Sequence, residues 1–125
     1  MGRAASAAGA NAQAVLLFDS ALDLHRTISD RLGIALDLNS QGDEFWQLQA
    51  QQAALAAWWQ AREIARRIGL PLARQLDGIF DQVAQAVGAQ AFRQLEVDLS
   101  VHAEEWRQAG VAAARQAVAA GQPGA

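Results

Sequence analysis

The 125-residue chain contains neither cysteine nor lysine, and all ten of its basic residues are arginine. The absence of cysteine excludes disulfide bonds, thiol catalysis and thiolate metal sites. The absence of lysine excludes Schiff-base chemistry and the lysine-dependent phosphate-binding loop. Tyrosine is also missing, and there are only two prolines.

Long apolar runs and a strong net charge are missing as well. No apolar run approaches the roughly 18 residues that a membrane helix needs, and the N-terminus has no continuous apolar signal segment. The net charge of −3 gives no general attraction to nucleic acid or to an anionic membrane. We therefore predict no membrane association, disfavour a nucleic-acid partner, and expect a bacterial cytoplasmic location by default.

The residues that are present favour helices. Apolar residues make up 52% of the chain, and alanine, leucine, glutamine and arginine, which are strong helix formers, are abundant. Residues with β-branched side chains are sparse. A chain of this length buries about two-thirds of its unfolded surface, which is enough for one core. The composition predicts a single all-α domain.

Four amphipathic segments predict an up-and-down four-helix bundle over residues 13–120, between a small-residue leader (1–12) and a flexible tail (121–125). The first helix is expected over about 12–32, with Gly33 as its stop and a loop to about 40. The others are expected over about 40–68, 72–87 and from about 89 onward. In the first helix the apolar residues that recur at helical spacing are Leu17, Ala21, Leu24, Ile28 and Leu32.

The stretch ALDLHRTISDRLGIAL, around His25, resembles the phosphoacceptor box of one class of sensor histidine kinases. Asp23, Leu24 and His25 fall on that pattern, as do Ile28 and Leu32, whereas Arg26 and Asp30 depart from it. The resemblance implies a phosphotransfer or kinase-dimerisation bundle in which His25 accepts a phosphoryl group. The alternative is a half-buried histidine at the edge of the apolar stripe.

The stretch EIARRIGLP, residues 63–71, resembles the first half of a DNA-binding helix-turn-helix. The resemblance implies a regulator that binds DNA through residues 62–78. Four arginines would then contact phosphates: Arg62, Arg66, Arg67 and Arg74. Gln75 and Gly78 stand where that motif needs apolar residues. A plain helical corner at Gly69, Leu70 and Pro71 is the alternative.

Two residues are candidate metal ligands in the last helix. His102 lies in a stripe with Leu95, Leu99 and Trp106, and Asp98 precedes it by four residues. The Glu-x-x-His spacing of di-iron bundles and the His-Glu-x-x-His motif are both absent. We therefore predict no metal or other cofactor, and expect His102 to be a structural residue bonded to Asp98.

Trp58 and Trp59 are adjacent, and Trp46 precedes them in the same predicted helix. Neighbouring helical positions point about 100° apart, so both rings cannot enter one narrow seam. Either this helix is covered on two sides or a tryptophan faces a partner chain. Aromatic anchors are typical of interfaces, which favours Trp46, Trp58 and Trp59 as interface residues.

The chain has no nucleophile–base pair, no mechanistically spaced carboxylates and no phosphate-binding loop, so catalysis is not expected. We predict a non-catalytic bundle that binds protein, including itself as a homodimer. Histidine phosphotransfer through His25 and DNA binding through residues 62–78 remain alternative hypotheses, the first of them placing the chain in signalling.

Overall fold

The computed structural model describes residues 2–121, with side chains from residue 7 onward. Within this range all regular secondary structure is helical, which confirms the all-α prediction. The helices are α1 (Gly2–Thr27), α2 (Arg31–Gln47), α3 (Gln51–Ile68), α4 (Leu72–Val87) and α5 (Ala89–Gly121). The predicted number of four helices is wrong, because the described residues form five.

The structure has one helix more than predicted because two helix ends, at Ser29 and Gln49, have no glycine to mark them in the sequence. Ser29, Gln49 and Gly69 all have positive φ angles, of 57°, 61° and 72°. In each case the next amide donates to a carbonyl five residues back: Asp30 to His25, Ala50 to Phe45 and Leu70 to Ala65, at 2.8–2.9 Å. This is the Schellman ending, in which glycine is the usual left-handed residue. A glycine therefore marks the helix end at residue 69 in the sequence, whereas no glycine marks the helix ends at residues 29 and 49.

The boundaries predicted before residue 69 are corrected accordingly. Gly33, the predicted stop, lies in the first turn of α2, where its amide donates to the Asp30 carboxylate at 3.0 Å. Asp30 is thus the N-cap of α2. The predicted loop over 33–40 is helical, and the predicted helix over 40–68 is interrupted between Gln47 and Gln51. The predicted helix over 72–87 is confirmed by α4.

Residues 2–12, predicted as a leader, are helical and belong to α1, in which Ala12 is fully buried. Gly121, the first residue of the predicted tail, ends α5. Residue 1 and the rest of the tail, residues 122–125, lie outside the described residues. The division into leader, bundle and tail stays a prediction.

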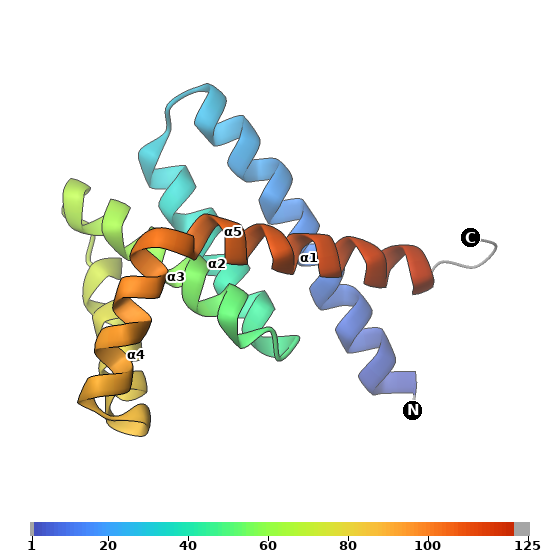
Figure 1. Cartoon of the computed structure of the whole chain (residues 1–125). Helices are drawn as coiled ribbons and strands as arrows, with labels where there is room; N and C mark the ends of the chain where they lie inside the picture. The colour runs from blue at the N-terminus through green and yellow to red at the C-terminus, as the bar shows by residue number, and fades with distance from the viewer. Residues whose placement is uncertain (1, 122–125) are drawn as a thin grey trace.

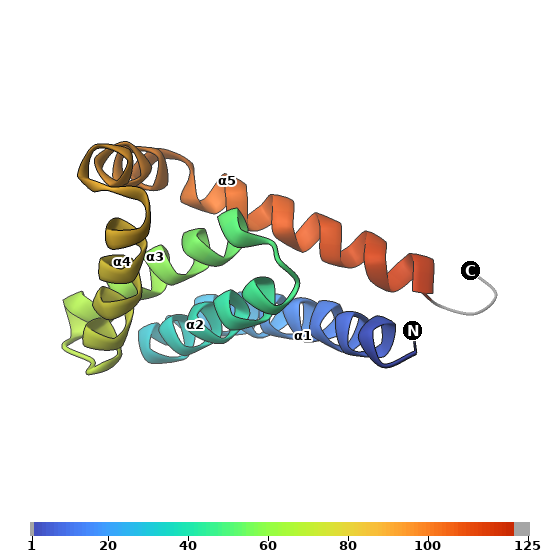
Figure 2. The ribbon, with the colours of Figure 1, turned by 90° about the horizontal axis from the view of Figure 1, so that it is seen from below.

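The helices form a layered arrangement in which α1 and α2 are an antiparallel hairpin (Figure 1). Figure 2 shows this hairpin along one edge of the molecule, and α3 and α5 both lie on the same side of the hairpin. The long helix α5 first runs beside α4 and then bends to cross over α3 and α1. Only one side of the hairpin is therefore covered by the rest of the chain.

Alanines of α3 line the centre of the core. The buried ones are Ala53, Ala54, Ala56, Ala57, Ala61 and Ala65, and they form a small-residue face that admits close neighbours. The neighbours include Gly110 on α5, where an added Cβ would lie 2.5 Å from that of Ala53. Small side chains let helix axes approach to about 8 Å, so α3 can pack against α2, α4 and α5.

The core side of α1 is not the side predicted from the sequence. Val15 and Leu22 are fully buried, whereas Leu17, Leu24 and Ile28 of the predicted stripe are exposed. The helix has apolar residues on both sides, so its spacing alone does not decide which side meets the core. The contacts of α5 and α2 decide it.

Candidate functional site

Five large aliphatic side chains lie exposed on the uncovered side of the α1–α2 hairpin, and we call this set the outer face. Leu17 is 71% exposed, Leu24 61%, Ile28 63%, and Leu32 and Leu36 of α2 are each 47% exposed. At 100° per residue, the three α1 residues point at least about 120° away from buried Val15 and Leu22. On α2, Leu32 and Leu36 point at least about 140° away from buried Gln41 and Phe45.

From Ala10 onward, the outer face carries no charged residue along α1. The other residues on that side of α1 are small or neutral: Ala10, Gln13, Ala14, Ser20, Ala21 and Thr27. A solvated helix surface normally carries charged residues, as at Asp23 elsewhere on α1. Exposed aliphatic faces of this kind are typical of interaction surfaces.

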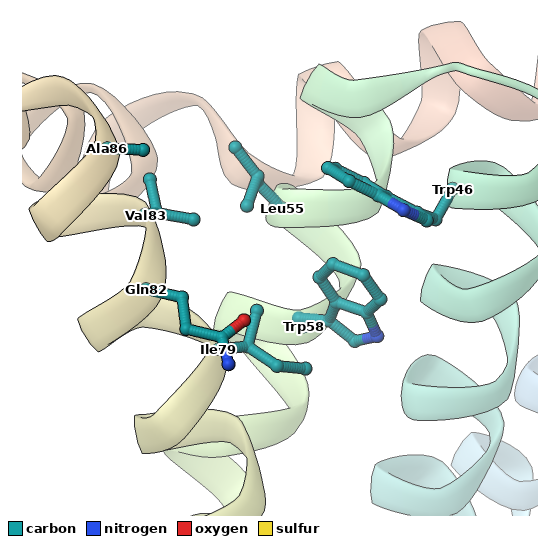
Figure 3. Close-up of a pocket in the computed structure, with 7 residues that line it drawn as sticks. All are labelled: Trp46, Leu55, Trp58, Ile79, Gln82, Val83 and Ala86. Carbon is teal, nitrogen blue, oxygen red and sulfur yellow. The ribbon is translucent and has the colours of Figure 1, made fainter.

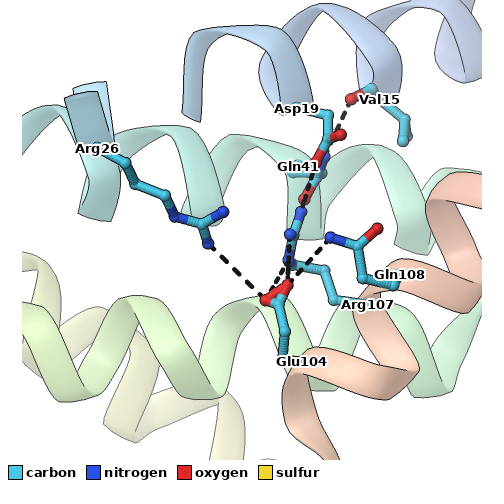
Figure 4. A network of polar contacts seen from close by, with 7 residues as sticks. All are labelled: Val15, Asp19, Arg26, Gln41, Glu104, Arg107 and Gln108. Carbon is cyan, nitrogen blue, oxygen red and sulfur yellow. Dashed lines mark hydrogen bonds and ion pairs between the residues drawn. The ribbon is translucent and has the colours of Figure 1, made fainter. Parts of the chain in front are cut away.

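The opposite side of the hairpin is held by a buried arginine (Figure 4). Arg107 of α5 is fully buried, and its guanidinium donates to Asp19 of α1 at 2.7 Å and to Gln41 of α2 at 2.9 Å. It also donates to Glu104 on its own helix. The Gln41 amide in turn donates to the Val15 carbonyl at 3.0 Å. One side chain thus fixes α1 and α2 against α5.

Burial acts to lower the pKa of Arg107, but its hydrogen bonds and ion pairs with Glu104 and Asp19 outweigh burial and raise the pKa. The guanidinium therefore remains a cation inside the core. All three Arg107 nitrogens have acceptors within the chain. The network acts as a structural clamp between α1, α2 and α5.

His25 lies at the end of α1 between two carboxylates of the helix that follows. Its Nδ1 is 2.5 Å from a carboxylate oxygen of buried Asp37, and its Nε2 is 3.9 Å from the Asp30 carboxylate. The ring rests on Gly33, where an added Cβ would lie 2.7 Å from it. The side chain is part-buried, as the sequence allows, and a carboxylate from α2 fixes its orientation.

Of the three predicted interface tryptophans, Trp58 and Trp59 lie on different sides of α3, and Trp46 lies on α2. Trp58 is buried against α2, with its ring centre 5.7 Å from that of Trp46 at a tilt of 38°, and it donates to Asp43 at 3.3 Å. Trp59 faces α4 and meets Phe80 edge to face at 5.6 Å. Of the two arrangements that the sequence allows, the structure has the helix covered on two sides. Trp46 is the most exposed of the three, at 45%.

Trp46 and Trp58 border a groove of about 380 Å³ between α3 and α4 (Figure 3). Its other walls are Leu55, Ile79, Gln82, Val83 and Ala86. The groove is apolar and contains no ionisable side chain among these residues. It can accept an apolar group but has no chemistry of its own.

The four arginines of the predicted DNA-binding segment are not gathered on one open surface. Arg62 is buried, with its guanidinium 4.5 Å from the ring centres of both Trp59 and Phe80. Burial and the nearby Arg66 lower the pKa of Arg62. Asp77 pairs with Arg62 at 3.6 Å and with Arg66 at 2.7 Å. Arg67 and Arg74 are exposed.

His102 is exposed, whereas the stripe in the sequence predicts a core position. Its Nδ1 is 2.8 Å from Glu105 and its ring stacks on Trp106, whereas Asp98 accepts from Gln94. The predicted bond between His102 and Asp98 is therefore wrong. Within residues 2–121 no three histidine or acidic side chains gather in a way that could hold a metal ion.

Sequence reasoning missed the Arg107 network entirely. Asp19 and Arg107 are 88 positions apart, so no local spacing connects them. A possible signal is that Arg107 follows Ala103 and precedes Val111 at four-residue intervals, on a face that is otherwise apolar. Such an arginine needs buried acidic partners.

Comparison of the chain with protein-family models, curated proteins and solved structures finds no match. Among the described helices, none combines the length and the apolar character needed to cross a membrane.

Proposed function

We propose that this protein is a non-catalytic interaction module that associates with itself through the outer face of α1 and α2. The observation that carries the proposal is the exposure of Leu17, Leu24 and Ile28 on a helix whose opposite side already forms the core. A bacterial cytoplasmic location and a part in signalling accompany this proposal as predictions.

The energetics favour a reversible complex. Full burial of a leucine or isoleucine side chain contributes about 1.5–3 kcal/mol. The five side chains of the outer face are already partly buried, so two copies together gain roughly 10–18 kcal/mol. Association costs about 4–15 kcal/mol. Because the gain exceeds the cost over most of these two ranges, we expect a reversible dimer whose population depends on concentration.

Sedimentation equilibrium of the wild-type chain and of a Leu17→Gln/Leu24→Gln variant tests this proposal. We expect the wild type to form a concentration-dependent dimer and the variant to remain a monomer. The matched control is Val97→Gln/Val101→Gln, which changes two exposed aliphatic residues of α5 (57% and 70% exposed) and should still dimerise. A monomeric wild type at hundreds of micromolar, or equal dimerisation of both variants, would refute the proposal.

Phosphotransfer through His25 is the second candidate, favoured by the Asp37 carboxylate that orients the imidazole. Such a carboxylate stabilises the cationic ring that forms when the free nitrogen attacks phosphorus. Asp30 disfavours phosphotransfer, because its carboxylate lies 3.9 Å from Nε2 of His25 and repels an anionic phosphoryl donor. Incubation with phosphoramidate, followed by intact-mass measurement, tests it. An acid-labile phosphoryl adduct absent from His25→Gln would support it, and an unmodified wild type would exclude it.

A further inference from the structure

We propose that two copies of this chain pair their α1 helices antiparallel in a single register, which places each large side chain of one copy opposite an alanine of the other. Leu17 then faces Ala21 of the second copy, Leu24 faces Ala14, and Ile28 faces Ala10. This inference rests on the proposed self-association and specifies its geometry.

The spacing along the outer side of α1 is that of a helix–helix seam. Counting from Ala10, the seam residues follow at intervals of four, three, four, three and four: Ala10, Ala14, Leu17, Ala21, Leu24 and Ile28. Alternation of three and four is the heptad pattern, which keeps one side of a helix against its partner over several turns. The stretch is about 27 Å long at 1.5 Å per residue.

The sizes of the seam residues select the orientation. In a parallel, in-register pair, Leu17 would meet Leu17 and Ala21 would meet Ala21, so crowded layers would alternate with empty ones. The antiparallel register pairs large with small in every layer, so the two backbones can approach closely and evenly along the seam.

The charges permit a two-fold arrangement. Residues that flank the seam are neutral or aromatic apart from one histidine: Asn11, Gln13, Phe18, Ser20, His25 and Thr27. A two-fold axis brings copies of the same residues together, so an exposed charge there would oppose its own copy. His25 already has a carboxylate partner in Asp37 of its own chain.

The second helix of the hairpin widens the contact. Leu32 and Leu36 of α2 are also exposed, and they point away from the side of α2 on which Phe45 is buried. Two adjacent helices give a face roughly 20 Å wide. Its area is of the order of the roughly 800 Å² that each partner contributes to a standard interface. A second copy is therefore an occupant of suitable size.

Single cysteines test the register, because the chain has none of its own. Ser20 lies beside the two-fold axis in this register, whereas Gln13 lies beside Thr27 of the second copy. Along the seam, the two copies of Gln13 are about 18 Å apart and the two copies of Thr27 about 24 Å apart. All three side chains are exposed. We expect a short bismaleimide to join Ser20→Cys to itself, and to join Gln13→Cys to Thr27→Cys only when these two variants are mixed.

The outcomes separate the register from the self-association. Self-linking of Gln13→Cys and of Thr27→Cys would mean a parallel pair and overturn the proposed register. No linking at any of the three positions, in a chain that still dimerises in sedimentation, would place the interface elsewhere and also overturn it. A chain that sediments as a monomer would refute the proposed function together with the register.

Discussion

The two sides of the α1–α2 hairpin reverse the usual distribution of polar and apolar groups. The inner side has a buried cation at its centre, Arg107, held by Asp19 and Gln41. The outer side has exposed leucines and, from Ala10 onward, no charged residue along α1. In most helices the charged residues face water and the leucines face the core.

This reversal indicates different roles for the two sides. Hydrogen bonds to a buried guanidinium have strict geometry, so the inner side fixes how α1 and α2 lie on α5. Contacts between aliphatic side chains are less directional, so two aliphatic surfaces can associate and separate without matching individual hydrogen bonds. The inner side therefore defines the fold, and the outer side is available for association.

The largest expected effect is the loss of the inner cation. Arg107→Met should lower the free energy of unfolding by about 3–5 kcal/mol, because Asp19 would remain without its charged partner. Arg115→Met, on the exposed side of the same helix, is the control and should change stability by less than about 0.5 kcal/mol. Urea unfolding measures both, and equal effects would show that the network does not hold the fold.

Substitution of one leucine on each side of α1 compares the two sides directly. Leu22→Ala should cost about 2–5 kcal/mol, because Leu22 is fully buried. Leu24→Ala should cost less than about 0.5 kcal/mol in the monomer, since Leu24 is 61% exposed. Urea unfolding at low micromolar concentration checks this. A similar cost at both positions would mean that α1 is turned differently on the core.

Two glycines test how closely the inner layer is packed. Gly110→Ala should destabilise the chain by about 1–3 kcal/mol, because the new Cβ would meet Ala53 and the ring of Phe45. Gly78→Ala in α4 has open space around it and should stabilise the helix by up to about 1 kcal/mol. Thermal unfolding of both variants measures the contrast, and a stabilising Gly110→Ala would show looser packing.

The smallest effect concerns Glu44, which, unlike Arg107, has a buried oxygen without a hydrogen-bond partner. Burial, with a contribution from Asp43, raises the pKa of Glu44 above its ordinary 4.5. The folded state therefore holds this proton more tightly than the unfolded chain does, and the wild type loses stability as the pH rises above 4.5.

Glu44→Gln does not titrate, so its advantage over the wild type should be present at pH 7 and shrink as the pH falls toward 4. Denaturant unfolding across this range checks the trend. An advantage that grows on acidification would contradict the assigned direction of the pKa shift.

The sequence predicts those features that depend on local signals. Gly69, Leu70 and Pro71 mark one corner, because glycine and proline have strong backbone preferences. Ser29 and Gln49 make the same type of helix end without such a preference, so two helix boundaries were missed.

The side of α1 that meets the core was also missed, for a different reason. Leu17, Leu24 and Ile28 form a better apolar stripe than Val15 and Leu22 do, yet the latter are buried. An interaction surface and a core surface follow the same helical spacing. The contacts that α1 makes with α2 and α5 distinguish them.

A dilution series followed by NMR amide shifts tests the central claim most directly. Between high and low micromolar concentration, we expect the amides that shift to belong to α1 and the first turns of α2. Amides around Arg107 on α5 should stay fixed. Shifts centred on the groove at Trp46 and Trp58, or no concentration-dependent shifts at all, would contradict the assignment of the outer face as the surface of association.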